Sequence, residues 1–78
     1  MRINNMTFKQ LKNSFTYHAP TKDQVGIYQE LRSKGLELAE MIKNLCPDNA
    51  ETVLAIRKVE EAIMWGNKSI ACSGDSDE

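Results

Sequence analysis

Two long stretches with an apolar residue at every third or fourth position, separated by only three residues, limit this chain to one kind of fold. The first stretch carries Val25, Tyr28, Leu31, Gly35, Leu38, Ala39, Ile42 and Leu45, and the second carries Val53, Ile56, Val59, Ile63 and Ile70. This spacing predicts helices over residues 22–45 and 49–71, each with one apolar face. Because the intervening Cys46-Pro47-Asp48 is very short, the two helices are expected to form an antiparallel hairpin.

Capping boxes mark where the helices begin. In this motif an N-cap side chain and a Glu or Gln three residues later satisfy each other's exposed backbone amides. The candidate pairs are Thr7 with Gln10, Thr21 with Gln24, and Asp48 with Glu51. The first pair predicts a short helix over residues 7–14, and Pro20 keeps segment 15–20 extended. We therefore predict an all-α fold in a single domain of residues 1–72, followed by a disordered acidic tail at 73–78.

The small size of the chain makes self-association the expected source of extra stability. A domain of 78 residues buries only about 60% of the surface that its unfolded chain exposes. His18, Cys46 and Cys72 are too far apart for a zinc site, and the hairpin separates the two thiols too widely for a disulfide. The third helix also carries apolar residues off its main stripe, namely Leu54, Ala55, Ala62 and Trp65. One partner helix cannot cover both sides, so we expect contact with other copies of the chain.

The position of the turn sets an expected register between the two long helices. With the turn centred near residue 47, facing residues have numbers that sum to about 94. This register places Tyr28 opposite Gly66 and Arg32 opposite Ala62, and it brings segment 17–18 to the 65–70 end of the third helix. Aromatic, basic and amide groups are therefore expected at one end of the hairpin.

Charge and hydropathy argue against several functions. A net charge of −1 disfavours a protein that coats DNA or RNA. No apolar run reaches the length of a membrane span and no leader is visible, so we expect a cytoplasmic protein without membrane contact. There is no nucleophile signature or phosphate-binding glycine loop, and Glu60 and Glu61 diverge on a helix. We expect no catalytic residue, no metal and no cofactor.

The pair Tyr17 and His18, just before Pro20, is a candidate ligand platform. Flat rings on an extended segment offer faces on which a nucleobase can stack. The alternative is that the two rings pack the N-terminal arm onto the hairpin.

Arg32 and Lys34 on the second helix are candidate phosphate-binding residues. An arginine fork binds a phosphate with two hydrogen bonds, and a lysine adds a point charge. The alternative is an ordinary salt bridge, for instance with Glu61 or Glu30.

The segment Met64-Trp65-Gly66-Asn67 is unusual for an exposed helix, because Gly66 weakens the helix while permitting close approach of another backbone. We expect an oligomer interface here, with Trp65 as its anchor, Asn67 hydrogen-bonded across it, and Met64 and Ile70 beside them. The alternative is that Trp65 fills the core of a single chain.

Taken together, several segments resemble a family of phage anti-CBASS proteins. They are Phe15-Thr-Tyr-His-Ala-Pro20, Gln24…Tyr28…Leu31-Arg32, Leu38-Ala39, Cys46-Pro47 and Glu60-Glu61-Ala-Ile-Met-Trp65-Gly-Asn67-Lys-Ser-Ile-Ala71. The most specific element is Tyr-His-x-Pro combined with Glu-Glu-Ala-x-Met-Trp-x-Asn at the observed distance. The resemblance covers residues 15–71 and implies a compact helical homohexamer in the host cytoplasm. Such a protein sequesters cyclic oligonucleotide messengers, so that the CBASS effector is never activated.

The resemblance also implies roles for single residues. Tyr17 matches the base-stacking tyrosine of the family, Arg32 lies where relatives carry a basic residue for the phosphates, and His18 borders the same pocket. The implied function is a sponge that binds 3′,3′-cGAMP and related cyclic dinucleotides without cleaving them. A separate site for cyclic trinucleotides is implied as well, although Cys72 stands where a basic residue is expected, and Lys34 or Lys68 would have to compensate.

Two other functions stay open on the sequence. A helical-hairpin adaptor or inhibitor would bind another protein through the exposed apolar surface of the third helix, and it predicts no nucleotide binding. A DNA-binding module would need a basic recognition face, whereas Glu60 and Glu61 interrupt the basic residues Arg57, Lys58 and Lys68.

Overall fold

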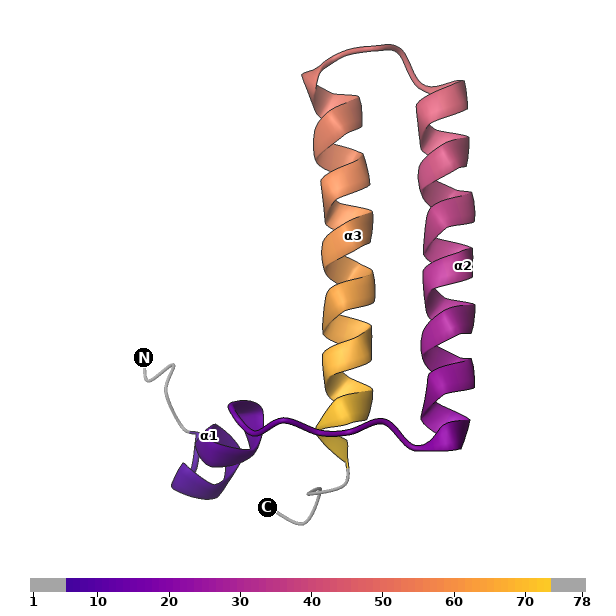
Figure 1. Ribbon diagram of the computed structural model, residues 1–78. Coiled ribbons are helices and arrows are strands. Elements are labelled where there is room, and N and C mark those ends of the chain that lie inside the picture. The colour runs from indigo at the N-terminus through magenta and orange to yellow at the C-terminus, as the bar shows by residue number, and fades with distance from the viewer. Residues whose placement is uncertain (1–5, 74–78) are drawn as a thin grey trace.

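The protein consists of three helices in the predicted order (Figure 1). The structure, a computed structural model, describes residues 6–73. Helix α1 spans Phe8–Ser14, α2 spans Lys22–Leu45 and α3 spans Ala50–Ala71, and no strand occurs among the described residues. The all-α prediction is confirmed. The predicted acidic tail lies outside the described residues from position 74 onward.

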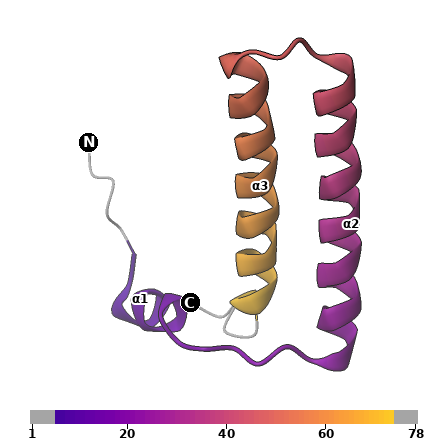
Figure 2. The ribbon, with the colours of Figure 1, turned by 45° about the horizontal axis from the view of Figure 1, so that its top comes forward.

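Helices α2 and α3 lie antiparallel as a hairpin, and α1 lies beside the C-terminal end of α3 (Figure 1). Figure 2 shows the same arrangement from a second direction, with the segment after α1 leading across to the start of α2. Cys46 at the turn and Cys72 at the end of α3 are both free thiols. Within residues 6–73 no helix has the length and apolar character needed to span a membrane.

The two predicted threonine capping boxes are present, but the cap of α3 differs from the prediction. Thr7 and Thr21 each exchange two hydrogen bonds with the glutamine three residues later. At α3 the side chain of Asn49, and not that of Asp48, accepts from the Thr52 amide at 2.9 Å. The prediction that α3 begins with a box at Asp48 is therefore wrong, and the helix begins one residue later. Asparagine caps as well as aspartate does, so residue type alone does not favour Asp48 over Asn49.

The packing between α2 and α3 centres on one glycine. Among the described residues no apolar side chain is buried, whereas Gly35 is. A Cβ atom built on Gly35 would lie 2.7 Å from Ile63 Cγ1, so the missing side chain lets Ile63 pack directly against α2. The hairpin therefore depends on a close approach of two helices more than on a filled core.

The observed register differs from the predicted one by about one helical turn at this contact. Gly35 lies against Ile63, whereas the predicted register placed Val59 there, and Leu31 lies near Gly66 in place of Tyr28. Part of the shift follows from the later start of α3 at Ala50. The rest follows from the fit of Ile63 to Gly35, which no rule of sequence spacing contains.

Two glycines of α2 should respond in opposite directions to the same substitution. A Cβ atom added at Gly26 would have nothing within 4 Å, so Gly26→Ala should raise the free energy of unfolding by about 0.5–1 kcal/mol through helix propensity. Gly35→Ala should lower it by about 1–3 kcal/mol, because Ile63 must shift. Urea unfolding of both variants at one protein concentration measures the difference. Equal effects would show that Gly35 is not in close contact with Ile63.

Candidate functional site

A groove containing two cationic side chains lies between α2 and α3. We call it the Arg32 groove; it has a volume of about 370 Å³ and is lined by Tyr28, Arg32, Met64, Asn67, Lys68 and Ala71. Arg32 is exposed, and within residues 6–73 its guanidinium makes no ion pair and no hydrogen bond. No described residue uses any of its five N–H donors, which suit an anionic ligand.

Two further polar residues of the Arg32 groove differ in their contacts. Lys68 Nζ donates to the Ser14 carbonyl oxygen at 2.6 Å, so it already ties α1 to α3. Asn67 Oδ1 is shielded from solvent and has no hydrogen-bond donor among the described residues. Leaving such an acceptor unpaired costs roughly 1–3 kcal/mol. A donor from a ligand or from another copy of the chain would remove that cost.

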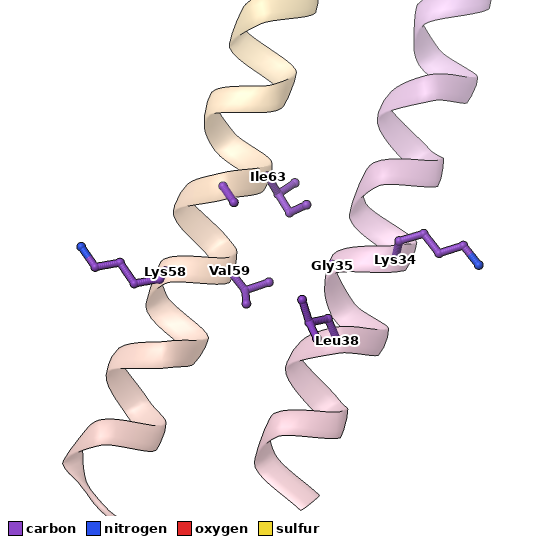
Figure 3. Close-up of a pocket in the computed structure, with 7 residues that line it drawn as sticks. Lys34, Gly35, Leu38, Lys58, Val59 and Ile63 are labelled. Atoms are coloured by element: carbon purple, nitrogen blue, oxygen red, sulfur yellow. The ribbon is translucent and has the colours of Figure 1, made fainter. Parts of the chain in front are cut away.

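A second groove is lined by other residues of the same two helices. This Gly35 groove has a volume of about 340 Å³ and is lined by Lys34, Gly35, Leu38, Lys58, Val59, Ala62 and Ile63. Figure 3 shows its branched apolar side chains pointing between the helices beside Gly35, while Lys34 and Lys58 point away from each other. The Gly35 groove is therefore mainly apolar, with one lysine at either side.

The structure does not bring Arg32 and Lys34 together. Arg32 lines the Arg32 groove, whereas Lys34 lines the Gly35 groove and its Nζ lies 3.7 Å from Glu37 Oε1. A salt bridge was the alternative interpretation of Lys34, but its partner is Glu37 and not Glu61 or Glu30. Lys34 and Arg32 therefore cannot hold one phosphate within a single chain.

The expected placement of Arg32 opposite Ala62 is wrong, because the shifted register puts Ala62 in the Gly35 groove.

Tyr17 and His18 are adjacent in sequence but have different environments. The Tyr17 side chain is 83% exposed and lines neither groove. His18 is half-buried, and its Nε2 donates to the Asn13 carbonyl oxygen at 2.8 Å. This bond lies within the N-terminal arm, whereas the hydrogen bonds from the arm to α3 involve the Asn13 side chain and the Ser14 carbonyl. The two rings therefore make none of these hydrogen bonds to the hairpin, and the alternative interpretation of the pair stays a prediction.

The four residues expected at an oligomer interface are divided between three locations. Met64 and Asn67 line the Arg32 groove, and Ile70 is half-buried near the start of α2, where its carbonyl accepts from Gln24 Nε2 at 3.4 Å. Trp65 lines neither groove, is 57% exposed, and donates from Nε1 to Glu61 Oε2 at 3.2 Å. Trp65 therefore does not fill a core within the single chain.

Two residues near the site were given no functional role from the sequence. Tyr28 was assigned to the apolar face of α2, yet it lines the Arg32 groove one helical turn before Arg32. Residues four apart lie on the same side of a helix, so this spacing could have assigned Tyr28 and Arg32 to one site from the sequence. Asn13 is only 9% exposed and donates from Nδ2 to the Cys72 carbonyl oxygen at 3.2 Å. No local pattern indicated that contact, which joins residues far apart in the chain.

The family model of the Acb2/Tad1 hairpin domain matches residues 9–71, which include α2, α3 and nearly all of α1. The chain belongs to the Acb2/Tad1 hairpin family. This is the anti-CBASS sponge family that the sequence resembles, and its members bind cyclic oligonucleotides and do not cleave them. No curated protein and no solved structure gave a significant match. In this Acb2/Tad1 hairpin, both grooves lie within the matched residues.

Proposed function

We propose that the protein is a sponge for cyclic dinucleotides of the 3′,3′-cGAMP type. It binds them intact in the host cytoplasm, without a cofactor or a metal, and so prevents activation of the CBASS effector. The observation that carries this proposal is the Arg32 guanidinium, which has no polar partner among residues 6–73 and lies in a groove also lined by Lys68 and Tyr28. Membership in the Acb2/Tad1 hairpin family supports the ligand class.

The residues of the groove suit the chemistry of a cyclic dinucleotide. The ligand carries two phosphates and two bases, so it needs a few local cations and flat apolar faces. Arg32 supplies a fork for one phosphate, and Lys68 lies in the same groove. Because the net charge of the chain is −1, attraction to the dianion must come from such local groups. Tyr17 supplies a stacking face, but from outside the groove.

Self-association completes the proposed site. Among the described residues no apolar side chain is buried, and Met64 and Trp65 are 55% and 57% exposed. A single chain therefore leaves apolar surface that contact with other copies would cover. We propose a homo-oligomer, a hexamer, in which Met64, Trp65, Asn67 and Ile70 contact other copies. The exposed Tyr17 of one copy would then reach a ligand held by Arg32 of another.

A second ligand class follows from the same family. Cyclic trinucleotides would bind apart from the Arg32 groove. Lys34 and Lys58 beside the Gly35 groove are the cations available there, although each lies within ion-pair distance of a glutamate. Position 72 carries a cysteine in place of a basic residue, and the Cys72 carbonyl already accepts from Asn13. We therefore expect trinucleotide binding to be weaker than dinucleotide binding.

Calorimetric titration of the purified protein with 3′,3′-cGAMP tests the function. A sponge must bind more tightly than the effector does, and nanomolar affinity corresponds to ~12 kcal/mol per site. Chromatography of the recovered ligand should show it unchanged, which separates binding from catalysis. If a folded protein gave no heat with 3′,3′-cGAMP, cyclic di-AMP or a cyclic trinucleotide, the sponge would be refuted. The protein-binding hairpin would then be the better account.

A further inference from the structure

Residues 13–18 form a small closed loop that displays the Tyr17 ring. The His18 ring folds back so that its Nε2 donates to the carbonyl oxygen of Asn13, and the Thr16 amide donates to the same oxygen at 3.3 Å. Between these two anchored ends the side chain of Tyr17 is 83% exposed. The loop is therefore fixed at its base and open at Tyr17.

The base of this loop is attached to the last turn of α3. Asn13 Nδ2 donates to the carbonyl oxygen of Cys72, and Lys68 Nζ donates to that of Ser14. The carbonyls at a helix C-terminus have no partner within the helix, so the Cys72 carbonyl is a natural acceptor for such a bond. Asn13 thus connects two contacts, because its side chain bonds to α3 and its main chain bonds to His18.

We propose that His18 and Asn13 are positioning residues, which hold the Tyr17 loop against α3 in the conformation that meets a nucleobase. This inference rests on the proposed function and gives His18 a different role from a direct ligand contact. A stacking ring on a free arm would lose conformational freedom on binding, and that loss weakens affinity. A loop that is already closed before the ligand binds avoids most of this loss of conformational freedom.

The conformational part of the proposal can be tested without any ligand. His18→Leu removes the donor to the Asn13 carbonyl, whereas His18→Gln keeps an N–H donor on a side chain of similar reach. Hydrogen exchange at residues 14–18 should be faster in His18→Leu and close to wild type in His18→Gln. Exchange in the middle of α2 and α3 should not change. Ser69→Ala is a matched control, because it removes a side-chain hydrogen bond of α3, to the Gly66 carbonyl, away from the loop.

The functional part is tested by a double-mutant cycle with Tyr17→Ala, using 3′,3′-cGAMP and calorimetry. If His18 acts through Tyr17, His18→Leu should weaken binding about tenfold when Tyr17 is present. The same change in the Tyr17→Ala protein should have less than roughly a twofold effect. His18→Gln should restore most of the affinity. A Lys68 variant would not separate the two roles, because Lys68 bonds to the Ser14 carbonyl and also lines the Arg32 groove.

The outcomes separate this inference from the proposed function. Equal losses of affinity in both backgrounds would make His18 a ligand contact and overturn the positioning role. Unchanged hydrogen exchange of residues 14–18 in His18→Leu would show that the bond from His18 to the Asn13 carbonyl does not hold the loop. That result would also overturn the positioning role. If the wild-type protein bound no cyclic dinucleotide, the proposed function would fail, while hydrogen exchange would still decide whether His18 holds the loop.

Discussion

Replacing Arg32 with alanine is expected to weaken the binding of 3′,3′-cGAMP by roughly 30- to 150-fold, which corresponds to one charge-assisted phosphate contact of about 2–3 kcal/mol. Within residues 6–73 the Arg32 side chain forms no hydrogen bond or ion pair, so its removal breaks no polar contact among these residues. The thermal midpoint should stay within a few degrees of the wild-type value. Calorimetry and a thermal scan on the same sample measure both quantities.

Arg57→Ala is the matched control for this substitution. Arg57 is an exposed arginine of α3 whose Nη1 bonds to Glu60 Oε1 at 3.0 Å, and it lines neither groove. Its loss should leave the affinity unchanged. Arg32→Lys should bind with intermediate strength, because it keeps the charge and loses the fork. Equal affinity of Arg32→Ala and wild type would exclude the Arg32 groove as the phosphate site.

Replacing Trp65 with alanine is expected to separate the oligomer into smaller species. Trp65 is 57% exposed in the single chain, although tryptophan is among the residues most often found at the energetic centre of an interface. Truncating such an anchor typically costs about 2–4 kcal/mol at each interface. Sedimentation velocity at micromolar concentration should show the wild type as one large species and Trp65→Ala as a smaller one.

Trp65→Phe tests whether apolar area buried by the ring, rather than its hydrogen bond, holds the oligomer together. Phenylalanine keeps a ring but cannot donate to Glu61, so the oligomer should persist if packing matters more than that hydrogen bond. An unchanged mass of Trp65→Ala would place the interface elsewhere. A wild-type protein that sediments as a monomer would refute self-association altogether.

The two substitutions also test whether the binding site is shared between copies. If Tyr17 and Arg32 act on one ligand from different chains, Trp65→Ala should dissociate the oligomer and also lose nucleotide binding. Arg32→Ala should lose nucleotide binding while the oligomer keeps its wild-type mass. Retention of full affinity by dissociated Trp65→Ala would show that each chain binds alone.

The helices themselves were predictable because their determinants are local. The spacing of apolar residues places α2 at Lys22–Leu45 as predicted, and the two threonine boxes mark the starts of α1 and α2. These signals depend on neighbours within one turn of helix, so the sequence contains them completely. The cap of α3 was missed by one residue, because the box pattern of Asp48 with Glu51 pointed to Asp48, whereas Asn49 caps the helix without a glutamate or glutamine three residues later.

The candidate site was predictable only in its residue types. Sequence indicated an arginine for phosphate and a tyrosine for stacking, and the resemblance of residues 15–71 indicated the ligand class. Tertiary structure decided that Ile63 packs on Gly35, and this contact sets the register that puts Arg32 in one groove with Lys68. Arg32 and Lys34 lie in different grooves for a local reason, because residues two apart on a helix do not face the same side. Tertiary structure also decided that His18 bonds to Asn13 and leaves Tyr17 exposed. The physical reason is that register and side-chain partners depend on how whole surfaces fit together, and a fit of that kind leaves no periodic pattern in the chain.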